Sequence, residues 1–247
     1  MSLVLVLVLA YVPALAGREV LRAWGHEDGP VESLGAAAFL AASVVFGAAW
    51  WRSRRSGREW WTRRLLRGHP GYFALCAILF VACMEEISWG QRVLGFKTPD
   101  AIARVNRQGE INIHNLAFFH GLDRDHHRKT SLELSHNLDR LFSAFNIVLG
   151  VVLPLAARQE KWRGGVDRLG VPLLSLGVGV LFLANYGVSK VLERFASAHA
   201  VVEIKECNAA LIWLALGVVA FLAVREGTAR SPAAAGSVLP AEGLTVR

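Results

Sequence analysis

The chain has 247 residues, of which 53% are hydrophobic and only 19% are charged, against roughly 25% charged residues in an average soluble domain. Its long stretches nearly free of charge exclude a disordered chain, a coiled coil and an ordinary soluble domain. The net charge of +7 does not indicate nucleic-acid binding, because basic loops also hold a membrane protein in its orientation. We expect an all-α, polytopic transmembrane helical bundle that has the lipid bilayer as its partner and binds no nucleic acid.

Apolar runs long enough to cross a bilayer predict about six transmembrane helices. The expected spans are 2–17, 32–51, 71–90, 139–157, 171–189 and 204–224. A long polar loop separates the third span from the fourth, and a tail rich in Ala, Gly, Ser and Pro follows the last. The chain therefore divides into a six-helix integral membrane domain, residues 1–226, and a disordered cytoplasmic tail, residues 227–247.

Two short loops, 52–70 and 158–170, are rich in Arg and Lys, which is typical of loops on the cytoplasmic side. Tryptophans that suit a membrane interface lie in these loops or directly before the first of them: Trp50, Trp51, Trp60, Trp61 and Trp162. This orientation predicts that both termini are cytoplasmic and that the long loop is extracytoplasmic. Most acidic residues then fall on the outer side, which suggests a functional site there.

The first polar segment on that outer side joins spans one and two. It contains Glu27, Asp28 and Glu32, with Glu32 at the mouth of span two. Asp28 could cap the second helix, with Pro30 in its first turn. The alternative is that the three acidic residues contribute to a polar site.

The second polar segment closes span three, where Glu85 and Glu86 follow a long uncharged stretch. Carboxylates inside a membrane are costly and are usually functional or paired. Neighbours on a helix point about 100° apart, so one of the two could bind a ligand while the other pairs with a base such as Arg92. We take these three as candidate catalytic residues, beside the polar residues Ser88, Trp89 and Gln91.

The third segment, 106–116, alternates polar and apolar residues in the long loop. Either a helix or an extended chain would bring Glu110 and His114 to the same side, as in a metal pair or an acid–base pair. We take these two as further candidate catalytic residues. The alternative is a surface helix whose polar face includes Gln108, Asn112 and Asn115.

The fourth segment enters span six with His199, Glu203 and Glu206 at i, i+4 and i+7, so that all three lie on one helical stripe. Stabilisation of the helix N-terminus by the two acids is the alternative explanation. Across the four segments, the candidate ligands of a divalent metal ion are Glu86, Glu110, His114, His199, Glu203 and Glu206.

The runs from Glu85 to Arg92 and from Asn106 to Leu116 resemble signatures of a group of functionally uncharacterised bacterial multi-pass membrane proteins. The segment from Glu27 to Glu32 is similar to the N-terminal part of that group. The resemblance implies a multi-pass protein of the bacterial cytoplasmic (inner) membrane. It supplies a fold class and no mechanism, and it leaves the oligomeric state open.

Three functions remain open from the sequence. The first is a metal-dependent enzyme that acts on a lipid or a lipid-linked envelope substrate. The second is an ion- or proton-coupled transport protein, and the third is a non-catalytic structural or assembly subunit. A metal held by His nitrogen and carboxylate oxygen would be Zn, Mn or Fe, whereas oxygen ligands alone favour Ca or Mg.

Overall fold

The computed structural model describes residues 11–12, 19–20, 23, 29–54, 69–106, 108–116, 119, 138–169, 174–196 and 198–229. Over these residues the chain is helical, apart from loops and an isolated β-bridge between Asn106 and Leu116. Three helices are long and apolar enough to cross a membrane, namely Pro30–Ser53, Arg140–Arg158 and His199–Arg225, while the apolar helix Leu176–Leu192 is shorter. The all-α prediction is therefore confirmed for the described chain. Most of the expected first span and residues 230–247 lie outside it.

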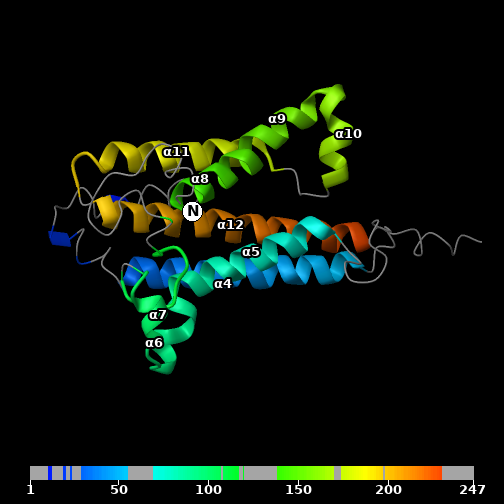
Figure 1. Cartoon of the computed structure of the whole chain (residues 1–247). Helices are drawn as coiled ribbons and strands as arrows, with labels where there is room; N and C mark the ends of the chain where they lie inside the picture. Colours follow the sequence, from blue (N-terminus) through cyan, green and yellow to red (C-terminus); the bar gives the residue numbers. More distant parts are fainter. Residues whose placement is uncertain are drawn as a thin grey trace, which may run out of the picture.

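The centre of the bundle is a parallel pair of helices, α4 (Pro30–Ser53) and α12 (Ala198–Ala229) (Figure 1). Glycine on each helix allows the close approach, because it has no side chain at the contact. At one end a Cβ on Gly35 would lie 3.4 Å from Cys207 Cα, and further along a Cβ on Gly217 would lie 3.4 Å from the Phe46 ring.

Helix α5 (Pro70–Glu86) runs back along α4 in the opposite direction. The Ser43 hydroxyl of α4 donates a hydrogen bond to the Cys76 carbonyl of α5 at 2.8 Å. Because α5 returns along α4, the C-terminal end of α5 lies at the same end of the bundle as the start of α4.

The other side of the bundle consists of a segmented helix and its neighbour. Helix α8 (Leu138–Ile147) continues through a π-helical turn, η5 (Val148–Val152), into α9 (Leu153–Arg158), and α10 (Glu160–Leu169) follows. Helix α11 (Leu176–Leu192) crosses η5 so closely that a Cβ on Gly179 would lie 2.1 Å from the Gly150 carbonyl oxygen.

Four aromatic side chains from four helical segments fill the centre of the bundle, and we call them the aromatic cluster: Phe46, Phe145, Phe182 and Trp213. The Trp213 ring centroid lies 6.3 Å from that of Phe46, 5.7 Å from that of Phe145 and 5.5 Å from that of Phe182. Trp213 is fully buried and donates its indole N–H to Asn146 Oδ1 at 2.9 Å. The aromatic cluster therefore ties α4, α8, α11 and α12 together.

The observed helix ends differ from the expected ones by a few residues at most helices. Helix α4 has Gly29 as its N-cap and Pro30 in its first turn, so the prediction for Pro30 is confirmed, while Asp28 lies outside the described residues. Helix α12 starts at Ala198 rather than at residue 204. Helix α5 stops at Glu86 rather than at residue 90.

The early end of α5 has a backbone cause. Ser88, Trp89 and Gly90 have φ values of 47°, 55° and 79°, which no right-handed helix contains. The chain then forms two short helices, α6 (Gln91–Leu94) and α7 (Asp100–Ala103), beside the end of the bundle (Figure 1). The described residues of segment 106–116 follow as a loop, neither helical nor extended.

Candidate functional site

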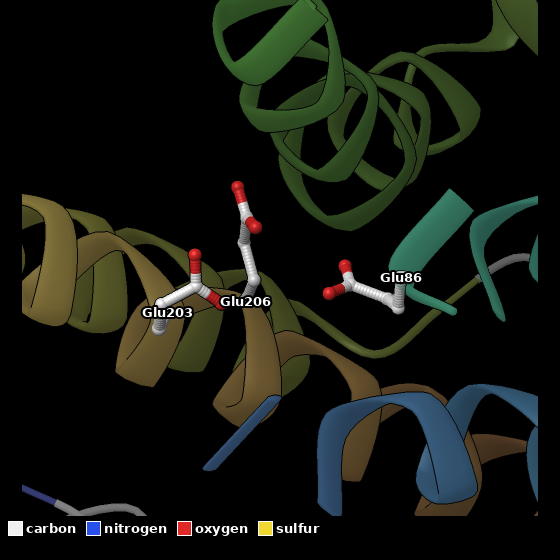
Figure 2. A group of neighbouring side chains, drawn as sticks. All are labelled: Glu86, Glu203 and Glu206. Carbon is white, nitrogen blue, oxygen red and sulfur yellow. The ribbon is translucent and has the colours of Figure 1, made fainter. Parts of the chain in front are cut away.

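Three carboxylates meet where α5 ends beside the first turns of α12, and we call them the carboxylate site: Glu86, Glu203 and Glu206. One oxygen of each lies within 4.8 Å of an oxygen of the other two. Figure 2 shows Glu86 pointing from α5 toward the two glutamates on α12. The i, i+3 spacing on α12 places Glu203 and Glu206 on one face, and the end of α5 brings Glu86 to that face.

The carboxylate site concentrates negative charge in a half-buried position. Like charges this close repel strongly where water screens them poorly. Glu32, near the start of α4, also interacts electrostatically with Glu86. Binding of a cation or of protons relieves such repulsion, and carboxylate oxygens are the ligands that Mg²⁺ and Ca²⁺ prefer in proteins.

Two basic side chains border the carboxylate site. His199 Nδ1 lies 3.6 Å from Glu203 Oε1, and the His199 side chain is half exposed. Lys205 Nζ lies 3.9 Å from Glu206 Oε1, and only 5% of the Lys205 side chain is exposed. His199 therefore stands at the outer edge of the site and Lys205 at its inner edge.

Glu85 has a different environment from Glu86. Its Oε2 accepts hydrogen bonds from the backbone N–H groups of Ile113 at 2.6 Å and His114 at 2.9 Å, and it lies 3.2 Å from His114 Nδ1. Its Oε1 accepts the Trp89 indole N–H at 2.6 Å. Glu85 thus holds the loop 106–116 against the end of α5.

A second set of contacts joins the same loop to the left-handed turn after α5. The fully buried Ser88 hydroxyl donates a short hydrogen bond to Glu110 Oε2. Asn112 Nδ2 donates to Ser88 Oγ at 3.1 Å, and the Ile111 backbone N–H donates to Gln91 Oε1 at 2.9 Å. Inside the loop, Asn115 Nδ2 donates a short hydrogen bond to Gln108 Oε1.

The structure therefore divides the predicted site residues into two groups. Glu86, Glu203 and Glu206 come together, with Glu32 and His199 nearby. Glu110 and His114 lie outside the carboxylate site and contact Ser88 and Glu85 instead. They belong to a loop network that also includes Trp89, Gln91, Gln108, Asn112 and Asn115. Glu27, Asp28 and the side chain of Arg92 lie outside the described part of the chain.

The sequence analysis missed Lys205. Its position could have identified it, because Lys205 lies where the chain enters the last apolar helix. A charged residue at such a position is usually functional or paired. Two asparagines inside apolar helices, Asn146 and Asn185, carry the same kind of signal and are 5% and 6% exposed.

Searches against protein-family models, curated proteins and solved structures find no match to this chain.

Proposed function

We propose that the chain is a six-span protein of the bacterial inner membrane whose carboxylate site binds a divalent metal ion at the extracytoplasmic face. We further propose that it is an enzyme acting on a lipid or a lipid-linked envelope substrate. The observation that carries the proposal is the convergence of Glu86, Glu203 and Glu206 from two helices far apart in the sequence.

The ligand set favours Mg²⁺, Ca²⁺ or Mn²⁺, because all three groups offer oxygen. When bound, such an ion polarises a phosphoryl or acyl oxygen or activates water. Glu203 is oriented by His199 on its outer side and Glu206 lies beside Lys205, so the protein itself supplies basic groups next to the carboxylates.

The position of the carboxylate site supports a lipid-linked substrate. Glu86 ends α5 and Glu203 lies near the start of α12, so the site lies at one end of the bundle rather than at its middle. At the opposite end of α4, the Arg54 guanidinium lies 5.1 Å from the Trp50 ring centroid and 4.9 Å from that of Trp51. Such an Arg–Trp group is typical of the cytoplasmic interface, which supports placing the carboxylate site outside.

The aromatic cluster favours an enzyme over a transport protein. It fills the bundle between the polar end and the Trp50–Trp51 end, and Trp213 within it is fully buried. A transport pathway needs polar groups along its length. The core around the aromatic cluster consists mainly of apolar side chains, and its buried Ser43 hydroxyl is already hydrogen-bonded to the Cys76 carbonyl.

Elemental analysis of the detergent-purified protein tests the proposal. We expect a stoichiometric divalent metal in the wild type and its loss in folded Glu86→Gln and Glu206→Gln variants. Glu193→Gln is the matched control, because Glu193 pairs with Lys190 at 2.7 Å on α11, and His114→Ala should also retain the metal. A wild-type protein without metal after incubation with Mg²⁺, Ca²⁺ and Mn²⁺ would overturn the metal site, and unchanged lipid and glycan profiles in a deletion strain would overturn the enzyme.

A further inference from the structure

A small cavity lies beside the carboxylate site, between α8, α11 and α12. Its volume is about 20 Å³, enough for one oxygen-sized group. Phe142, Ile147, Phe182 and Ala209 form its apolar walls, and its polar lining is Ser143, Asn146, Asn185, Tyr186 and Lys205.

The orientation of the Asn146 amide is fixed by its neighbour. Its Oδ1 accepts the Trp213 indole N–H at 2.9 Å, and an indole can only donate. The Nδ2 hydrogens therefore point away from Trp213, and among the described residues no hydrogen bond engages them. Asn146 is 95% buried, since its exposed fraction is 5%, so it presents a hydrogen-bond donor to the cavity that it lines.

In Asn185, by contrast, both the amide oxygen and the amide nitrogen form hydrogen bonds within the protein. Its Oδ1 accepts hydrogen bonds from the Tyr11 hydroxyl at 2.7 Å and from Asn208 Nδ2 at 3.1 Å. Its Nδ2 donates to the Lys205 backbone carbonyl at 2.8 Å. Asn185 therefore lines the cavity and fixes the α12 backbone at Lys205 through this hydrogen bond.

Lys205 connects the cavity with the carboxylate site. Its residue is 4% exposed and lines the cavity, and its ammonium lies 3.9 Å from Glu206 Oε1. A buried ammonium is costly unless it is paired, and it carries three donors. Together, Lys205 and Asn146 give the cavity the donors that an anionic oxygen requires.

We infer that this cavity binds one oxygen of a phosphate group carried by a lipid headgroup. The inference rests on the proposed function and deepens it, because it names the substrate class as a phospholipid or a lipid-linked phosphate. Lys205 places that phosphate next to Glu206 and hence next to the proposed metal. Phe182, which packs against Trp213 of the aromatic cluster, forms part of the apolar wall of the cavity.

Binding to the full-length protein in detergent, with EDTA present, tests the inference. The probes are radiolabelled inorganic phosphate in equilibrium dialysis, and phosphatidylglycerol against neutral diacylglycerol in native mass spectrometry. We expect phosphatidylglycerol to bind in preference to diacylglycerol and Lys205→Met to lower its affinity about tenfold or more. Lys190→Met is the matched control, since Lys190 pairs with Glu193 at the end of α11 and does not line the cavity.

Asn146→Asp is the second variant, chosen because it keeps an acceptor for Trp213 while replacing the donor with an anionic oxygen. We expect it also to lower phosphate affinity, and it decides the test if Lys205→Met is not monodisperse. Binding of inorganic phosphate without phosphatidylglycerol would support the phosphate site but assign it to a free phosphate. Wild-type affinity in the folded variants, or no binding of either phosphate probe, would overturn the inference.

The two proposals fail separately. Metal content is measured on the same preparations before EDTA is added. Phosphate binding in a protein that holds no metal would overturn the metal site and leave the phosphate cavity intact. A metal-loaded protein that binds neither phosphate probe would overturn the phosphate cavity and leave the metal site intact.

Discussion

Glu85 and Glu86 are neighbours in sequence and have opposite surroundings. Glu85 accepts two backbone N–H groups and an indole N–H, so its charge is used inside the loop network. Glu86 faces two further carboxylates on α12. The hydrogen bonds to Glu85 stabilise the fold. The three carboxylates of the carboxylate site are stable together only when a cation or bound protons balance their negative charge.

Replacement of Glu85 should therefore cost stability. We expect Glu85→Ala to lower the free energy of unfolding by about 3 kcal/mol, because it leaves several donors without their charged acceptor. Thermal unfolding in detergent measures the change. Glu193→Ala is the control and should stay within about 1 kcal/mol, since the Lys190–Glu193 pair is partly exposed. Equal losses in the two variants would show that Glu85 does not hold the loop.

Gly90 follows two left-handed residues and has φ of 79° itself. A Cβ at Gly90 would meet only the Leu94 side chain, at 3.7 Å, so an alanine side chain fits in the space. The left-handed backbone at this position, however, is unfavourable for alanine. We expect Gly90→Ala to destabilise the protein by about 1–2 kcal/mol, measured by thermal unfolding in detergent. A change below the error of that measurement would mean that the turn relaxes without cost.

At the scale of elements, the crossing of α11 over η5 depends on the absence of side chains at Gly150 and Gly179. We expect Gly179→Ala to separate the two segments and cost about 1–3 kcal/mol, because the new Cβ would lie 2.1 Å from the Gly150 carbonyl oxygen. Gly187→Ala on the same helix has nothing within 4 Å and should be neutral or stabilising by up to about 1 kcal/mol. Similar unfolding temperatures for both variants would contradict this crossing.

The sequence predicted the helices better than their ends. Apolar runs are enough to place α4 and α12, because a long stretch without charge has few alternatives to a helix. Three consecutive left-handed residues end α5, and two of them, Ser88 and Trp89, are not glycine, so no local rule signals them. The loop network holds that conformation, and it depends on contacts between segments more than 20 residues apart.

At the scale of the whole molecule, the arrangement of helix ends predicts which loops share a side of the membrane. We expect a membrane-impermeant maleimide to label Asp100→Cys in intact spheroplasts, and Glu160→Cys only after permeabilisation. Cys76, Cys83 and Cys207 are free thiols, so each test variant is made in a background that replaces them with alanine. The reverse pattern would invert the orientation, and labelling of both positions from outside would contradict the crossing by α8 and α9.

The sequence predicted most of the residues of the carboxylate site. It did not predict which of the candidate residues would lie close together. Helical spacing placed His199, Glu203 and Glu206 on one stripe, as the structure shows in the His199–Glu203 contact. No spacing within a segment could show that Glu86 would face that stripe while Glu110 faces Ser88. Those pairings follow from the parallel packing of α4 and α12 with α5 alongside, which is a property of the assembled bundle.

The carboxylate site joins Glu86, in the first half of the chain, to two residues of α12, the last helix that the structure describes. During synthesis, Glu86 therefore enters the membrane well before Glu203 and Glu206 leave the ribosome. A nascent or truncated chain that ends before α12 lacks two of the three carboxylates. Loading of the proposed metal is thereby restricted to chains in which α12 has been inserted beside α5.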